Sequence, residues 1–239
     1  MKKVIIVSRR LIRKNKLINW VSEIYLELMA QHNILPIIIP VAKGTPSIIE
    51  DYLLDYDGLL MMEGGDLGPH YYNENYPINE LDEYDQLKDE IETRCFKHAF
   101  ANKKPILGFC RGMHIINALS GGSNHQDVHI VNNNHILHID YNHYDELRHR
   151  IKLVEDTPLY KWYGQNELMV NSYHHQGIKN IAPILKPMAF ANDGLIEGVY
   201  LPGDHFVVGL QFHPERMLNE HKGNRIVFDA YFNAIKSIR

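Results

Sequence analysis

The sequence predicts an α/β fold, a three-layer sandwich in which helices cover both faces of a mostly parallel central sheet. Two observations lead to this prediction. In the first half of the chain, short apolar runs of strand length alternate with segments of helical periodicity, which is the pattern of βαβ units. In the last third, turn signals such as Asn192-Asp193-Gly194 separate apolar runs and indicate added antiparallel hairpins. We expect one domain over residues 1–239, because no linker is long enough to separate two.

The first half of the chain supplies three strands and three helices. Each predicted strand is a run of mainly apolar residues too short for a helix. Thr45-Pro46 opens one helix as an N-cap followed by proline, and Asn79 caps the next. The strands are expected at Val4–Val7, Leu35–Ile39 and Gly58–Met62, and the helices at Ile18–Ala30, Thr45–Leu54 and Glu80–Ala101. The basic stretch from Arg9 to Lys16 is expected to be a loop.

The second half begins with a buried strand at Pro105–Phe109. From Met113 the apolar residues recur at helical spacing, and Gly121-Gly122 ends that helix. Further strands are expected at Arg150–Val154, Glu167–Ser172, Lys186–Ala191, Ile196–Leu201 and Phe206–Phe212, and helices between Pro158 and Tyr163 and at Glu220–Ser237.

The composition argues against several classes of protein. A net charge of −4 gives no reason to expect nucleic acid or a membrane surface as a partner. No apolar run approaches the roughly 18 residues of a membrane span, and Arg9-Arg10 ends the first apolar run too early for a signal peptide. Cys95 and Cys110 form no disulfide framework and suit a reducing compartment. We therefore expect a soluble, cytoplasmic protein.

The stretch Gly108-Phe-Cys-Arg-Gly112 lies between a predicted strand and a predicted helix. Glycines two residues before and after a nucleophile allow the sharp turn that exposes its side chain. The Cys110 sulfur would lie beside the first amides of the helix, whose partial positive charge favours a thiolate. A buried cysteine in an ordinary strand–helix turn is the simpler interpretation of this motif alone.

The third predicted strand ends in Glu63-Gly64-Gly65. In parallel α/β sheets, ligands bind outside the carboxyl ends of the strands, and glycines there let backbone amides approach a substrate oxygen. From Glu63 to Glu92 there are ten acidic residues and one basic residue. Most of these acids are expected on a solvated helix face, and the remainder hint at a cationic ligand.

The last predicted strand ends in His213-Pro214-Glu215. Side chains two residues apart in an extended segment point the same way. Glu215 can then orient the imidazole of His213 while His213 takes the proton of a thiol. A histidine at a strand end beside a surface glutamate is the alternative.

Histidines and asparagines are concentrated after Gly122, from His125 through His138 to His143. A zinc site is one interpretation of this segment. No cysteine pair or H-E-x-x-H spacing accompanies the histidines, so we expect no metal and instead a polar excursion over the site.

Taken together, Gly108–Gly112 and His213-Pro-Glu215 resemble the class I glutamine amidotransferase domain, which has a flavodoxin-like fold and a Cys-His-Glu triad. Three longer stretches resemble its gamma-glutamyl-gamma-aminobutyrate hydrolase branch, of the peptidase C26 type. They are Gly64-Gly-Asp-Leu-Gly-Pro-His-Tyr-Tyr-Asn-Glu74, Asn171-Ser-Tyr-His-His-Gln176 with Asp193-Gly-Leu-Ile-Glu197, and Gly209-Leu-Gln-Phe-His-Pro-Glu215. These motifs occur in family order and cover essentially the whole chain.

The resemblance implies a role for each matching residue. Cys110 would be the nucleophile, His213 the base and then the acid, and Glu215 the orienting carboxylate. The amides of Gly65 and Arg111 would form the oxyanion hole. Substrate contacts would come from Gly64, His114, Ser172, Tyr173, His174 and His175. Three positions depart from the family pattern. His114 stands where glutamine is usual, Glu63 where proline, glycine or serine is usual, and Asn124 where an apolar residue is usual.

The resemblance implies a cysteine hydrolase of gamma-glutamyl amides that needs no cofactor. The amine would be a polyamine or an amino acid such as gamma-aminobutyrate, and the acidic Glu63–Glu92 region favours the polyamine. The Arg9-Arg10 loop would instead suit an anionic leaving group. A glutaminase that supplies ammonia to a separate synthetase, or a non-catalytic glutamyl-binding protein, is the alternative. A homodimer is compatible with the sequence.

Overall fold

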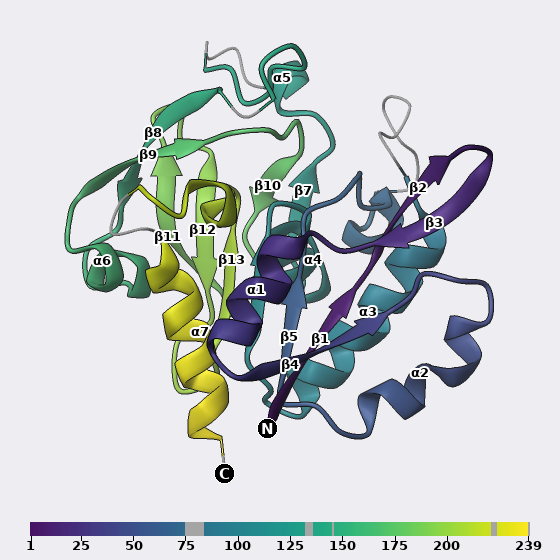
Figure 1. Ribbon diagram of the computed structural model, residues 1–239. Helices are drawn as coiled ribbons and strands as arrows, with labels where there is room; N and C mark the ends of the chain where they lie inside the picture. Colours follow the sequence, from purple (N-terminus) through teal and green to yellow (C-terminus); the bar gives the residue numbers. More distant parts are fainter. Residues whose placement is uncertain (75–83, 132–135, 145, 221–223, 239) are drawn as a thin grey trace.

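A nine-stranded sheet forms the centre of the molecule in the computed structural model, which describes residues 1–74, 84–131, 136–144, 146–220 and 224–238 (Figure 1). The strand order is β4-β1-β5-β6-β13-β12-β11-β8-β9. The first five are parallel: β4 (Ile34–Ile39), β1 (Lys2–Val7), β5 (Gly58–Met61), β6 (Ile106–Phe109) and β13 (Val207–Leu210). The rest run antiparallel to their neighbours: β12 (Ile196–Tyr200), β11 (Lys186–Ala191), β8 (Arg148–Leu153) and β9 (Glu167–Asn171). The expected α/β class with added hairpins is confirmed.

Helices cover both faces of the parallel part, which explains why its strands are apolar throughout. In β1, Val4 and Ile6 pack into the core beneath α1 (Glu23–Gln31) and α7 (Arg225–Ser237), with α6 (Pro158–Tyr163) further along that face. Ile5 and Val7 face the opposite core. That core lies beneath α2 (Thr45–Leu53), α3 (Gln86–Ala101) and α4 (Arg111–Leu119). No helix in the described ranges has the length and apolar character needed to cross a lipid bilayer.

The basic stretch after β1 is a hairpin and not the expected loop. β2 (Arg9–Arg13) pairs antiparallel with β3 (Lys16–Trp20), and the turn residues Lys14 and Asn15 both have positive φ. This two-residue turn matches the twist of a hairpin. The expected helix at Ile18–Ala30 is therefore wrong in its first part, and α1 begins at Glu23. The apolar side chains of Ile12 and Leu17 are exposed, so no buried face marked these strands in the sequence.

Two other helices begin later than predicted. α3 begins at Gln86, and the carboxylate of Asp85 caps it by accepting from the Lys88 amide. The predicted cap, Asn79, lies outside the described residues. α7 begins at Arg225 and not at Glu220. A small sheet of β7 (Ser123–His125) and β10 (Gly177–Asn180), and the short helix α5 (Val128–Val131), lie where no element was predicted.

The central strands bring distant parts of the chain to one edge of the sheet. β6 lies between β5 and β13, with Gly108 opposite Met61 on one side and Phe109 opposite Leu210 on the other. Because all three strands are parallel, the segments that follow them emerge side by side. Glu63-Gly64-Gly65, Cys110 and His213 are in those three segments.

Candidate active site

The turn between β6 and α4 holds Cys110 in a strained conformation. Its φ of 47° and ψ of −104° lie where residues with a Cβ are rarely found. The Cys110 amide donates to the carbonyl of Leu210 on β13 at 2.7 Å. A Cβ on Gly108 would lie 2.7 Å from the carbonyl carbon of Gly112, and one on Gly112 would lie 2.5 Å from the Met61 oxygen. The two glycines therefore let strand, turn and helix pack closely around the thiol.

His213 contacts both Cys110 and Glu215. The Nδ1 atom of His213 is 2.9 Å from Oε1 of Glu215, and the imidazole also hydrogen-bonds Cys110. Burial lowers the pKa of His213, but the charge of Glu215 and these hydrogen bonds outweigh burial and raise the pKa to about 10. The imidazole is therefore protonated at neutral pH.

The expected contact between His213 and Glu215 is present, but an extended strand does not produce it. β13 ends at Leu210, and Pro214 begins the 3₁₀-helix η2 (Pro214–Met217). Asn171 holds the backbone of His213 from both sides. Its Oδ1 accepts from the His213 amide at 2.8 Å, and its Nδ2 donates to the His213 carbonyl at 3.0 Å. Sequence reasoning missed this role, because no local pattern shows which side chain holds the His213 backbone.

Glu63 is buried at the cavity wall, where its carboxylate makes a hydrogen bond and two ion pairs. Tyr25 donates its hydroxyl to Oε2 of Glu63 at 2.8 Å, and Arg9 and Arg216 lie 3.6 and 3.8 Å from Oε1. Burial raises the pKa of Glu63, but the charges of His213, Arg9 and Arg216 and the Tyr25 hydrogen bond lower it below the usual value. Glu63 is therefore an ionised carboxylate matched by arginines.

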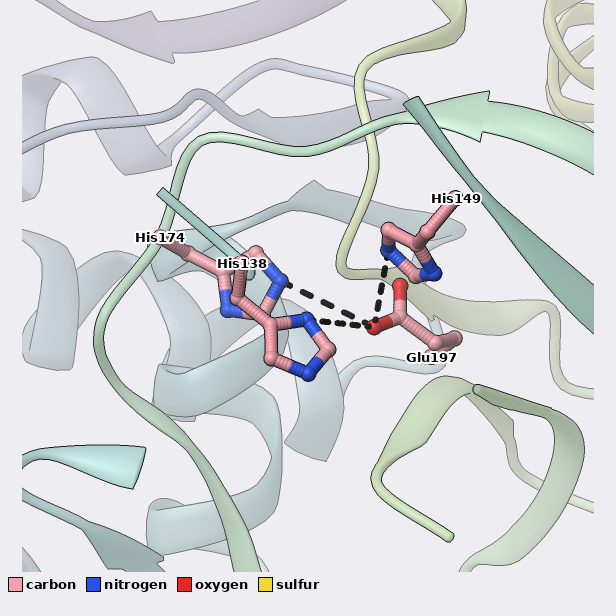
Figure 2. Close-up of side chains that lie close together, drawn as sticks. All are labelled: His138, His149, His174 and Glu197. Carbon is pink, nitrogen blue, oxygen red and sulfur yellow. Dashed lines mark ion pairs between the residues drawn. The ribbon is translucent and has the colours of Figure 1, made fainter. Parts of the chain in front are cut away.

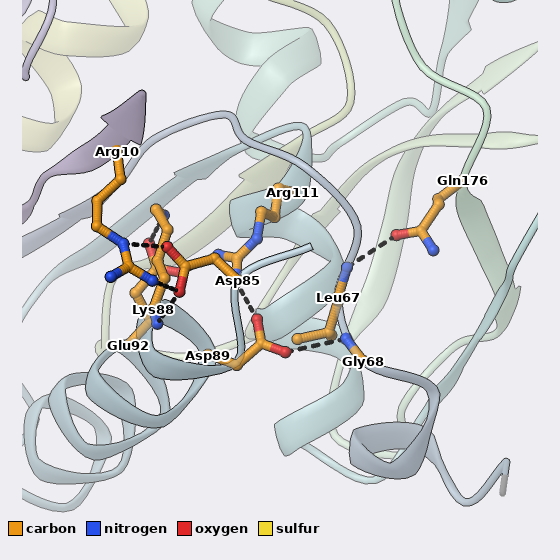
Figure 3. A network of polar contacts seen from close by, with 9 residues as sticks. All are labelled: Arg10, Leu67, Gly68, Asp85, Lys88, Asp89, Glu92, Arg111 and Gln176. Carbon is orange, nitrogen blue, oxygen red and sulfur yellow. Dashed lines mark hydrogen bonds and ion pairs between the residues drawn. The ribbon is translucent and has the colours of Figure 1, made fainter. Parts of the chain in front are cut away.

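Acidic residues at the start of α3 form an ion-pair network that is largely buried (Figure 3). Arg111 pairs with Asp89 and Glu92, Lys88 pairs with Glu92, and Arg10 from β2 pairs with Asp85. The expectation of a solvated acidic face fails for Asp89 and Glu92, which are fully buried. Glu80, Asp82 and Glu83 lie outside the described residues.

This network also anchors the glycine loop that follows β5. The Gly68 amide donates to Asp89 at 3.0 Å, and the Leu67 amide donates to the Gln176 side chain at 3.2 Å (Figure 3). The side chain of Arg111 belongs to the network, whereas its backbone amide lies in the first turn of α4. Amides of a first helical turn have no acceptor within the helix, and Gly64, Gly65 and Arg111 all line the cavity beside Cys110.

A hydrogen-bonded chain connects His114 to the thiol. The Nε2 atom of His114 is 2.8 Å from Oε1 of the Gln211 side chain, and Nε2 of that side chain donates to the Cys110 sulfur at 3.5 Å. Burial lowers the pKa of His114 to about 4, although the Gln211 hydrogen bond partly opposes that shift. His114 is therefore neutral at pH 7 and donates from Nε2. Asn124 supports this helix by donating to the His114 carbonyl at 3.2 Å.

These groups surround a cavity of about 320 Å³. Tyr173, His174 and His175, which the resemblance assigned to substrate binding, line it, and Nε2 of His175 is 2.6 Å from Oδ1 of Asp66. Ser172 is not among the lining residues, because its buried hydroxyl donates to the His138 carbonyl at 2.7 Å. Residues of the cavity wall that the sequence analysis did not select are Trp20, Ile139, Tyr144 and Arg216.

Two groups of described residues bring together three or more side chains of metal-ligating type. Glu63, His213 and Glu215 form the first, whose carboxylates already lie beside arginines. The second is His138, His149, His174 and Glu197, which is separate from the thiol but includes His174 of the cavity wall.

Solved structures of a glutamine amidotransferase and of a glutaminase domain share this architecture. A glutamine amidotransferase from Thermotoga maritima matches with a TM-score of 0.59 at 15% identity, over 98% of this chain and 90% of that one. The glutaminase domain of a Trypanosoma brucei CTPS matches with a TM-score of 0.67 at 13% identity, over 100% and 95% of the two chains. At these identities the likeness establishes the fold.

The chain belongs to the Peptidase C26 family, whose model matches residues 7–215. Protein NtpR of Enterococcus hirae is 32% identical over 209 residues, which cover 87% of this chain and 86% of NtpR. Gamma-glutamyl-gamma-aminobutyrate hydrolase PuuD of Escherichia coli K12 is 27% identical over 219 residues, 89% of this chain and 85% of PuuD. The resemblance inferred from the motifs is confirmed, and family membership supports a hydrolase.

Proposed function

We propose that this protein hydrolyses gamma-glutamyl amides through a glutamyl thioester, with Cys110 as nucleophile, His213 as acid and base, and Glu215 as the orienting carboxylate. One observation carries the proposal. The strained Cys110 hydrogen-bonds His213, and the buried Glu215 carboxylate keeps that imidazole charged. A thiol beside an imidazolium is activated as a thiolate, which is the form that attacks carbonyl carbon.

The reaction proceeds in two halves. The Cys110 thiolate attacks the amide carbon, and the backbone amides of Gly65 and Arg111 donate hydrogen bonds to the carbonyl oxygen as negative charge develops on it. His213 gives its proton to the departing nitrogen as the C–N bond breaks, which leaves a glutamyl thioester and the free amine. A water molecule then attacks the thioester carbon while His213 takes its proton. Glutamate leaves, and Cys110 returns to the thiolate.

The glutamyl group would lie against the cavity wall. Gly64, His114 and Tyr173 to His175 line the space next to Cys110. His114 reaches the thiol only through Gln211, so we assign it to shaping the glutamyl pocket and not to proton transfer. Asp66 and His175 pair at 2.6 Å and provide adjacent acceptor and donor groups for an amino acid head.

The charges at the cavity favour an amine that carries a carboxylate over a polyamine. Asp89 and Glu92, which suggested a cationic ligand, are paired with Arg111 and Lys88. Arg9 and Arg216 both line the cavity beside Glu63. A substrate carboxylate adds a second anion for these two guanidinium groups, whereas a polyamine adds cations beside them. The similarity to PuuD, a gamma-glutamyl-gamma-aminobutyrate hydrolase, supports this choice.

The test is glutamate release from gamma-glutamyl-gamma-aminobutyrate, gamma-glutamyl-putrescine and glutamine, with wild type and Cys110→Ala compared. We expect turnover of the gamma-aminobutyrate amide to be fastest and the variant to lose more than about a thousandfold in rate. The rate of Glu215→Gln should be about 10²- to 10⁴-fold lower than that of wild type, because the imidazole of His213 keeps its place but loses its counter-charge. Turnover of glutamine alone would point to an ammonia-supplying glutaminase. No turnover, with a thiol inert to a glutamine-like electrophile, would point to a binding protein.

A further inference from the structure

Four buried side chains from four separate segments meet at one point near the cavity wall (Figure 2). His138 comes from the segment after α5, His149 from β8, His174 from the loop after β9, and Glu197 from β12. They are 1%, 8%, 4% and 0% exposed. One ligand atom from each lies within 4.8 Å of the others.

The atoms that face one another in this cluster, which we call the histidine cluster, have no hydrogen-bond partners among the described residues. They include Nδ1 of His138, Nε2 of His149, Nε2 of His174 and both carboxylate oxygens of Glu197. Burying one polar atom without a partner already destabilises a fold. A cation shared by these atoms would remove that cost.

Two histidines are held so that a lone pair points inward. Nε2 of His138 is 2.8 Å from Oδ2 of Asp193, and that carboxylate can only accept, so the proton lies on Nε2 and Nδ1 is a bare acceptor. Nδ1 of His174 is 2.9 Å from the Gln176 carbonyl and donates to it, which leaves Nε2 as the acceptor. Carboxylates and carbonyls orient metal-binding histidines in this way.

The spacing also suits a metal ion. Oε1 of Glu197 lies 3.8 Å from Nδ1 of His138 and 3.6 Å from Nε2 of both His149 and His174. Tetrahedral zinc with bonds near 2.0–2.1 Å separates its ligand atoms by about 3.3 Å. Small side-chain movements would therefore close the cluster around an ion. The carboxylates of Glu63 and Glu215, in contrast, already have arginine or tyrosine partners.

We propose that His138, His149, His174 and Glu197 bind one divalent transition metal ion, with zinc as the expected occupant. Three imidazole nitrogens and one carboxylate oxygen are ligands that zinc prefers, and four protein ligands leave no open position. The site is therefore structural. This departs from the expectation of no metal, which rested on the lack of a short ligand motif; here the ligands come together only in the fold.

The position of the ion explains what it would do. The Ser172 hydroxyl and the His174 amide both donate to the His138 carbonyl, at 2.7 and 3.0 Å. The ion would fasten these two joined segments to β8 and β12. Because Ile139 and His174 line the cavity, metal binding would fix one wall of the glutamyl pocket.

The test is the metal content of protein produced without a polyhistidine tag in zinc-supplemented medium. Elemental analysis of the full chain should find about one zinc per molecule in wild type and in Cys110→Ala. Glu197→Gln and His149→Gln should each lose most of it. His205→Gln is the matched control, because His205 lies before β13 and hydrogen-bonds the Lys104 carbonyl. It should retain the metal.

A second measurement uses wild type alone and does not depend on variants folding. Chelation should lower Tm, and added Zn²⁺ should raise it again in a concentration-dependent way. Co²⁺ should replace zinc and give the visible absorption of a tetrahedral site. Folded wild type without bound metal, whose Tm does not respond to Zn²⁺ or Co²⁺, would overturn the proposal and leave a protonated histidine cluster. None of these readouts uses hydrolase activity, so they can fail or succeed independently of the proposed function.

Discussion

At the residue scale, the strained backbone of Cys110 has a measurable cost. A φ of 47° costs a residue with a Cβ free energy that glycine largely avoids. Cys110→Gly should therefore be more stable than Cys110→Ala by about 1 kcal/mol, although both lack the thiol. Urea unfolding of the two variants measures the difference. A glycine variant that is the less stable of the two would show that this turn carries no strain.

His114 should act on catalysis through Gln211. His114→Leu removes the donor to Oε1 of the Gln211 side chain and leaves that oxygen buried without its partner. We therefore expect kcat/KM to fall by roughly tenfold. His114→Gln supplies an amide donor in place of the imidazole, so its kcat/KM should fall by less than that of His114→Leu. Steady-state kinetics with one gamma-glutamyl amide separate the two. Equal losses in both variants would mean that side-chain size, and not the hydrogen bond, matters at this position.

The catalytic candidates were the most predictable residues of the site. Cys110, His213 and Glu215 lie in short motifs, and the glycine and proline residues of these motifs can be interpreted from the local sequence alone. Asn171 and Gln211 were not predictable as neighbours of His213 and Cys110, because their roles depend on which strands become adjacent.

At the scale of elements, the parallel strands were predicted to within one or two residues and the hairpin was not. β1 and β6 are buried on both faces, so their apolar runs are visible without alignment. β2 and β3 are largely exposed and basic, and the sequence pattern of a surface hairpin resembles that of a loop. The start of α3 was misplaced because local capping signals do not specify which candidate cap the tertiary structure uses.

The β2–β3 hairpin should affect substrate choice through Arg9. Its guanidinium lies 4.8 Å from the centre of the Trp20 ring and lines the cavity. Arg9→Gln removes one positive charge, so KM should rise for gamma-glutamyl-gamma-aminobutyrate more than for gamma-glutamyl-putrescine. The ratio of the two KM values, compared with wild type, gives the result. Parallel changes for both substrates would place the leaving amine away from the hairpin.

The ion pairs between α3 and α4 should matter for stability far more than those on the surface. Arg111→Met leaves the buried Asp89 without its ion-pair partner and Glu92 with Lys88 alone, and it should destabilise the fold by about 3 kcal/mol or more. Arg94→Met is the matched control, since Arg94 pairs with the exposed Glu50 and should change stability by less than about 1 kcal/mol. Chemical unfolding of both variants tests this. A similar, small effect in both would indicate that water reaches the Asp89 and Glu92 carboxylates.

At the scale of the whole molecule, the histidine cluster marks the limit of sequence reasoning. The histidines near His138 are visible as a group in the sequence, but their partners in the fold are not. His149, His174 and Glu197 are distributed over β8, a loop and β12, and only the order of strands in the sheet brings them together. When the order of strands brings the ligands together, their spacing along the sequence follows no motif.

The stability of the whole fold should depend on pH through His213. Its folded-state pKa of about 10 is above the unfolded value near 6.5. Protonation therefore stabilises the fold fully below pH 6.5, and this contribution is lost as pH rises towards 10. The difference in unfolding free energy between wild type and His213→Gln should shrink over that range, while that between wild type and His205→Gln should not. A constant difference for His213→Gln would mean that His213 is neutral in the folded protein.

The place of β13 in the sheet has a consequence for biosynthesis. β13 spans residues 207–210, so the ribosome makes it after the other eight strands, yet it lies between β6 and β12. Until β13 emerges, the growing chain can form two half-sheets whose inner edges, β6 and β12, are exposed and able to pair with other chains. The strand that joins the halves also leads directly to His213. A prematurely terminated chain would thus be both inactive and prone to aggregate, so the cell gains no partly functional fragment from it.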